Sequence, residues 1–147
     1  MKLHKTSRII GDDENNTRLI KVVDGDTEGA AEVKAFGELS AEVVEGEMAG
    51  RTIEAFAWLE RAPKGHEINV TEKRSGLRLV RIPILTDQGE WFQLDDDLFK
   101  KMLPTLMEGC KTAAFHRFQE ASEERLAEMF KHMDKTPPLE HSGKLTA

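Results

Sequence analysis

Cysteine, histidine and grouped carboxylates, the side chains that most often perform catalysis or bind metals, are few and scattered in this sequence of 147 residues. Cys110 and His116 could act as nucleophile and base, but six residues apart on a helix they point to different faces. Glu128 and His132 stand one helical turn apart, close to the spacing of carboxylate–histidine metal sites, but such i, i+4 pairs more commonly stabilise an exposed helix face. The sequence therefore predicts no catalytic residue, no metal ligand and no cofactor, and we do not expect an enzyme.

Residues 24–29, with the sequence DGDTEG, resemble the start of a calcium-binding loop. Oxygen ligands stand at alternate positions and a glycine at the sixth, as such loops require. The twelfth position should supply two carboxylate oxygens, yet it is Ala35. We interpret the segment as a solvated acidic turn. The sequence also lacks the motifs of phosphate loops, dinucleotide-binding turns and serine nucleophiles.

Charged residues are unevenly distributed in this chain, whose net charge is −6. Residues 9–60 hold thirteen acidic and four basic side chains, whereas residues 61–81 hold six basic and two acidic ones. A solvated surface normally mixes the two signs, so the basic block is a candidate binding site. Its cations are Arg61, Lys64, Lys73, Arg74, Arg78 and Arg81.

The basic block coincides with a predicted β-hairpin. Residues 67–85 have the pattern of two strands joined by a four-residue turn with a glycine. This hairpin places Lys73 and Arg74 at its tip. Strict alternation of side chains puts Arg78 and Arg81 on opposite faces of the second strand.

Two tryptophans flank the hairpin in the sequence, Trp58 before it and Trp91 after it. Cations that follow phosphates, together with aromatic rings on which bases stack, make up a single-strand binding surface. The six cations and two tryptophans are therefore the candidate nucleic-acid site. The alternative is that the rings belong to the core and that the charged tip only keeps the hairpin soluble.

The first two thirds of the chain are predicted to be rich in strands. Apolar and β-branched runs bounded by turns occur at residues 17–23, 32–36, 39–45, 51–59, 66–72, 77–85 and 91–94. Alanine and glutamate in residues 32–45 would also suit a helix, and residues 1–16 are expected to form an arm and a loop. We predict an α+β fold in which residues 17–94 form about six or seven short antiparallel strands in a barrel-like or sandwich-like body.

Residues 96–134 are predicted to be helical. The acidic run at residues 95–97 suits a helix start, because carboxylates accept the free backbone N–H groups. Pro104 is expected to open a second helix at its first turn. Two apolar stripes follow, and their offset at residues 122–124 predicts either a bend or a pair of last turns that leave the body and bind a partner helix.

The second apolar stripe has two interpretations. It either covers the sheet of its own chain or forms the seam of a homo-oligomer. Its members are Leu126, Met129, Phe130 and Met133.

Length and composition fit a single domain over residues 1–134, followed by a mobile tail at residues 135–147. Neither a signal peptide nor a run of about 20 apolar residues is present. The single cysteine agrees with a reducing compartment. We therefore expect a cytoplasmic protein with no membrane partner.

The overall plan, an acidic and cysteine-poor chain with a β-rich body, the basic block at residues 61–81 and a helical end, resembles small proteins of bacterial viruses. It is similar in outline to the Drc family of phage single-stranded-DNA-binding RNA polymerase cofactors. That resemblance implies single-strand binding, oligomers formed through a helix and a role in viral transcription or replication in the host cytoplasm, with RNA polymerase or another host protein as a partner. The sequence departs from standard single-strand binding proteins in its last residues, GKLTA, which replace an acidic tail with an apolar tip.

Two hypotheses about function follow. The first is a single-stranded DNA-binding protein that uses the basic hairpin and the tryptophans. The second is an inhibitor or anti-defence protein, whose acidic residues 9–60 present a DNA-like surface to a basic host factor.

Overall fold

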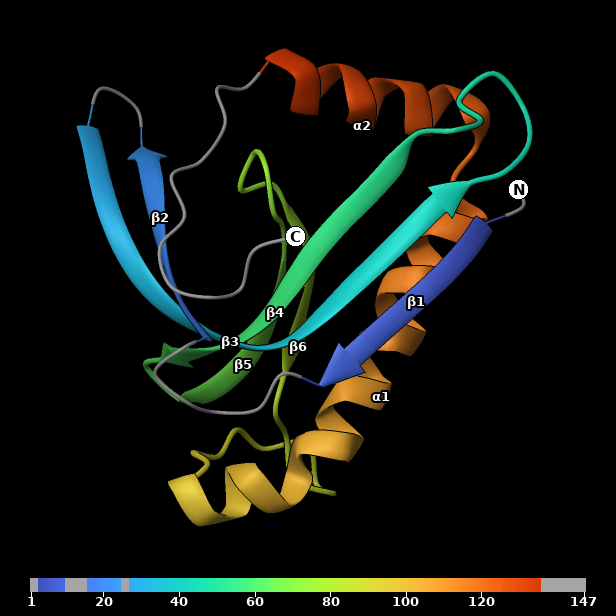
Figure 1. The fold of residues 1–147 in the computed structure, drawn as a ribbon. Coiled ribbons are helices and arrows are strands. Elements are labelled where there is room, and N and C mark those ends of the chain that lie inside the picture. Colours follow the sequence, from blue (N-terminus) through green and yellow to red (C-terminus); the bar gives the residue numbers. More distant parts are fainter. Residues whose placement is uncertain (1–2, 10–15, 25–26, 136–147) are drawn as a thin grey trace.

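The computed structural model describes residues 3–9, 16–24 and 27–135 of the chain. Strands precede helices throughout (Figure 1). The elements are β1 (Leu3–Ile9), β2 (Thr17–Asp24), β3 (Thr27–Val43), β4 (Thr52–Ala62), β5 (Gly65–Glu72), β6 (Arg78–Pro83), α1 (Asp96–Glu120) and α2 (Glu123–Lys135). The predicted α+β class, with a β-rich first part and a helical last part, is confirmed.

Five strands form one open antiparallel sheet in the order β1-β3-β4-β5-β6, and β2 pairs with the first half of β3. The predicted barrel-like or sandwich-like closure is wrong, because β1 and β6 lie at opposite edges of this order. The predicted strand number was also too high for the described residues. The segments predicted at residues 32–36 and 39–45 fall on one strand, which ends at Val43, and residues 91–94 contribute only a single bridge. Residues 3–9, predicted as part of an arm, form the edge strand β1.

A β-bulge lets β3 continue through the glycine that was expected to end it. Ala35 pairs with Trp58, and Gly37 pairs with the residue next to it on β4, so Phe36 is the extra residue. A bulge shifts the alternation of side chains and bends the strand. Odd-numbered residues before the bulge, such as Ala35, therefore pack on one face of the sheet, and odd-numbered residues after it, such as Leu39, pack on the other.

The main hydrophobic core lies between the sheet and the two helices. Its centre includes Phe36, whose ring meets Phe99 of α1 edge-on at 5.5 Å between centroids. A smaller cluster on the opposite face joins Ile20 of β2 to Phe56 and the half-buried Trp58 of β4. Side chains of β2 and of the first half of β3 thus pack against this face of β4, and in Figure 1 the two strands curve upward to the left of β4.

Helix α1 begins where the acidic run predicted. The Asp95 side chain accepts a hydrogen bond of 2.8 Å from the backbone N–H of Leu98. Pro104 lies inside α1, so the prediction that it opens a second helix is wrong. A proline in a helix interior is costly. Phe99 and Leu106 on either side of Pro104 are both buried in the core, and this packing keeps the two parts of α1 in one continuous helix.

The predicted bend at residues 122–124 is confirmed, since α1 ends at Glu120 and α2 begins at Glu123. The hydroxyl of Ser122 accepts a hydrogen bond of 3.1 Å from the backbone N–H of Arg125. Ser122 therefore satisfies one of the free donors at the start of α2.

The apolar stripe of α2 belongs to the core of its own chain. Leu126, Phe130 and Met133 are 0%, 2% and 3% exposed, and Met129 packs beside them. The stripe covers its own sheet, as in the first of the two interpretations above. These three side chains are not on the surface, where a second copy could bind them.

Part of what the sequence predicted lies outside the described residues. This is true of the tail at residues 136–147 and of residues 25–26 in the acidic turn. Among the residues that the structure does describe, no helix combines the length and apolar character needed to cross a membrane.

We predict that Phe130→Ala lowers the free energy of unfolding by about 3–5 kcal/mol, because it removes a fully buried aromatic ring. Urea denaturation followed by circular dichroism measures this change. The control is Leu98→Ala, at a side chain 37% exposed, which should cost less than about 0.5 kcal/mol. Equal effects of the two substitutions would show that α2 does not complete the core.

Candidate nucleic-acid interface

A second β-bulge, in β6, decides where the arginines of the basic block lie. Thr71 pairs with Arg78 and Val70 with Val80, so Leu79 is the extra residue. Leu79 is 1% exposed in the main core. The bulge shifts the alternation of β6 by one residue, which overturns the expectation that Arg78 and Arg81 lie on opposite faces.

Arg78 and Arg81 share the face of the sheet that points away from the helices. Arg81 pairs with Asn69, and Arg78 with Thr71, two residues further along β5. Asn69 pairs in turn with Trp58 on β4. An indole, an amide and a guanidinium therefore stand in one row across β4, β5 and β6.

Hydrogen bonds hold the middle of this row. The Trp58 indole N–H donates to the Thr71 hydroxyl at 2.9 Å, and that hydroxyl donates to the Asn69 side-chain oxygen at 2.8 Å. The Asn69 amide donates to a Glu60 carboxylate oxygen at 3.3 Å. Trp58 is thus fixed by its N–H, while its ring remains half-buried beside Phe56.

Arg81 is partly neutralised within the chain. Its Nε donates to a Glu67 carboxylate oxygen at 2.7 Å, and the Arg81 side chain is 55% exposed whereas that of Glu67 is 3% exposed. The hydrogen bond and the charge of Glu67 raise the pKa of Arg81. Arg78 is exposed, and no described residue forms an ion pair with it.

Arg18 is a further cation that the sequence did not single out. It lies on β2 opposite Val33 and is fully buried. Its Nη1 donates to the backbone oxygen of Thr17 at 3.0 Å. Burial lowers the pKa of Arg18, and the nearby charge of Glu38 opposes this effect. The only sequence signal was a basic residue within an apolar run, which also fits an exposed strand face.

The tip of the β5–β6 hairpin is tied to α2. Arg74 lies 3.2 Å from a carboxylate oxygen of Asp134 on α2. Arg51, which follows the turn after β3, lies 2.9 Å from the same oxygen. The buried Glu72 carboxylate accepts from both the backbone N–H and the hydroxyl of Ser75, which braces the tip. Arg51 is outside the basic block and was missed, because nothing local in the sequence links it to Arg74.

The remaining members of the predicted site lie at the other end of the sheet. Arg61 and Lys64 flank the β4–β5 turn, and β5 separates them from Lys73. β5 has eight residues, so its ends are roughly 23 Å apart at about 3.3 Å per residue. Trp91 is half-buried and pairs with Leu85 beyond β6, at the same end as Lys64. The eight residues therefore form two groups and not one finger.

His66 anchors the loop that carries Trp91. Its Nδ1 accepts a hydrogen bond of 2.9 Å from the backbone N–H of Leu94, and its own backbone N–H donates to Phe92 at 3.2 Å. Burial, and then the charge of Arg61, lower the pKa of His66. A neutral imidazole is required here, because a protonated Nδ1 cannot accept a hydrogen bond.

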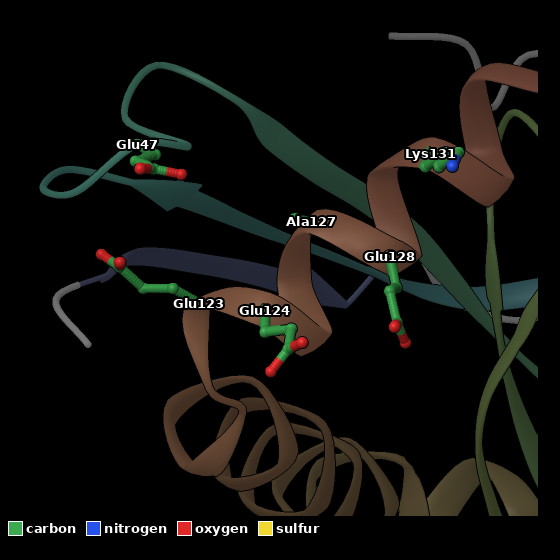
Figure 2. A pocket seen from close by; sticks show the side chains of 6 residues that line it. All are labelled: Glu47, Glu123, Glu124, Ala127, Glu128 and Lys131. Atoms are coloured by element: carbon green, nitrogen blue, oxygen red, sulfur yellow. The ribbon is translucent and has the colours of Figure 1, made fainter.

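A groove lined with carboxylates runs between α2 and the turn after β3 (Figure 2). It has a volume of about 510 Å³ and is lined by Glu47, Glu123, Glu124, Ala127, Glu128 and Lys131. Gly46, at φ +88°, lies close to the Glu123 carboxylate, so a Cβ at this position would displace that side chain. Among the described residues, none of the four carboxylates forms an ion pair.

Cys110 is fully buried, and burial raises its pKa to about 12. It is therefore a thiol at neutral pH and a poor nucleophile. Within the described residues, no three His, Cys, Asp or Glu side chains lie where they could hold a metal ion together.

No family model, no curated protein and no solved structure matches this chain. Its function must be inferred from its own side chains and their geometry.

We predict that the free energy of unfolding falls as the pH drops below about 6.5, the usual pKa of histidine. The folded-state pKa of His66 is lowered, so the unfolded chain binds this proton more readily, and acid favours unfolding. Urea denaturation between pH 7.5 and 5.5 measures the slope. His66→Gln should reduce it, and His116→Gln, at an exposed histidine, should not. An unchanged slope in His66→Gln would assign it to other groups.

Proposed function

We propose that this chain is a single-stranded DNA-binding protein that uses the face of β4, β5 and β6 opposite the helices. The observation that carries the proposal is the bulge at Leu79, which brings Arg78 and Arg81 onto the same face as Trp58. Guanidinium groups bind phosphates through several donors, and aromatic rings offer a stacking surface to any base. The arrangement suits a ligand with alternating phosphates and exposed bases.

The two arginines have different roles in this proposal. Arg78 is exposed and contributes a full charge to the phosphates. The charge of Arg81 is partly neutralised by Glu67 at 2.7 Å, which also fixes the orientation of the guanidinium. Its remaining N–H donors stay available to a phosphate, because the side chain is 55% exposed. Stacking of one base on Trp58 would add about 1–3 kcal/mol.

By the outline it shares with Drc-type phage cofactors, such binding would serve viral transcription or replication in the host cytoplasm. Arg61, Lys64 and Trp91 would contact the same strand of nucleic acid at the far end of β5, roughly 23 Å away at about 3.3 Å per residue.

We predict that the chain binds a labelled oligothymidine more tightly than duplex DNA of equal length. The logarithm of its affinity should fall linearly with the logarithm of salt concentration, and Arg78→Gln should reduce that slope by about 0.7, the value for one phosphate on a single strand. Fluorescence anisotropy at several salt concentrations measures both quantities. In Trp91→Phe, quenching of the remaining tryptophan would report stacking on Trp58.

The control for this measurement is Arg125→Gln, which removes the same charge from an exposed site on α2. It should leave the slope unchanged. If Arg78→Gln behaves like Arg125→Gln, or if oligothymidine does not bind at all, the proposed site is refuted.

The acidic groove favours a second function, the binding of a basic host protein. Four exposed carboxylates without ion pairs among the described residues repel one another, and a cationic partner would relieve this. The lysine in the groove, Lys131, leaves a net negative lining.

For this second function we predict salt-sensitive binding of a labelled oligolysine peptide, weakened several-fold in the double variant Glu124→Gln/Glu128→Gln. A matched double variant, Glu54→Gln/Glu90→Gln, removes two exposed carboxylates elsewhere and should bind as the unmodified chain does. Equal oligolysine affinities of the two double variants would exclude the acidic groove as the binding site.

A further inference from the structure

Two arginines that are distant in the sequence converge on one carboxylate. Arg51 follows the turn after β3, and Arg74 is at the tip of the β5–β6 hairpin, yet both contact the same oxygen of Asp134, at 2.9 and 3.2 Å. All three side chains are 42–49% exposed. The Arg51 guanidinium also stands over the Phe130 ring, 4.4 Å from its centroid, so its position does not depend on Asp134 alone.

Asp134 is poorly placed for the stability of its own helix. It occupies the last turn of α2. The negative end of the helix dipole lies there, so an acidic side chain is unfavourable. The two arginines offset this cost. Exposed ion pairs are individually weak and are screened by salt, so another anion can replace the carboxylate.

We propose that Arg51 and Arg74 form a phosphate-binding site that Asp134 occupies in the unbound chain. The inference rests on the proposed function and extends it, because the occupant would be a phosphodiester of the bound single strand. Arg74 belongs to the turn that leads directly into β6 and Arg78. A backbone that passes Arg78 and Arg81 would therefore reach Arg74 and Arg51 next, and Asp134 acts as an autoinhibitory contact at that point.

The test compares Asp134→Asn with the unmodified chain in oligothymidine binding. We expect Asp134→Asn to bind about three- to tenfold more tightly, the range set by releasing two weak exposed ion pairs. Adding Arg51→Gln to Asp134→Asn should return the affinity to near its original value. Asp87→Asn is the matched control, since it removes one exposed carboxylate in a loop without releasing an arginine. Far-ultraviolet circular dichroism checks that each variant is folded.

A second measurement uses inorganic phosphate alone. Nuclear magnetic resonance of the arginine Nε–H groups should show Arg51 and Arg74 responding to phosphate at lower concentration in Asp134→Asn than in the unmodified chain. The Nε–H signal that is lost in Arg51→Gln belongs to Arg51, and the one that is lost in Arg74→Gln belongs to Arg74.

The outcomes separate the two proposals. If the unmodified chain binds oligothymidine through Arg78, and Asp134→Asn matches Asp87→Asn in both measurements, the autoinhibitory contact is refuted and the nucleic-acid function stands. If neither chain binds oligothymidine but phosphate reaches the arginines only in Asp134→Asn, the nucleic-acid function is refuted and the anion site stands. No response in either measurement refutes both.

Discussion

The architecture depends on one irregularity, the bulge at Phe36 in β3. This strand contributes apolar residues to two separate cores, Val33 and Ala35 to one and Leu39 to the other. All three positions are odd, so a regular strand would direct them to the same face. The extra residue reverses the alternation and bends the strand. As a result, one half of β3 packs under the helices, while the other half packs with β2 against the opposite face of β4.

The same device shapes the candidate interface. In β6 the bulge keeps Leu79 and Val80 in contact with the core, and the charged residues on either side of them then fall on the outer face together. Apolar burial therefore places Arg78 and Arg81, because the burial of Leu79 fixes the register of the strand. Candidate binding residues thus depend on packing that they take no part in.

Charge in this chain is organised by the tertiary structure as well as by the sequence. The basic block is divided between the two ends of β5, and one of its members, Arg74, meets an arginine from outside the block at Asp134. Carboxylates from the turn after β3 and from α2 likewise gather in one groove. Since the buried face of α2 fixes this helix on the sheet, α2 determines which carboxylates lie near which cations.

The sequence alone determined the features that depend on neighbouring residues. Helix caps, turn glycines and apolar periodicity act over a few positions, so they revealed the α+β class, the start of α1 at Asp95, the bend near Ser122 and the hairpin. Tertiary structure decided what depends on distant residues. The bulges at Phe36 and Leu79 arise because core packing outweighs strict alternation, and the open sheet arises because β1 and β6 never meet. The meeting of Arg51, Arg74 and Asp134 joins three segments that only the folded chain brings together, and no local pattern could have signalled it.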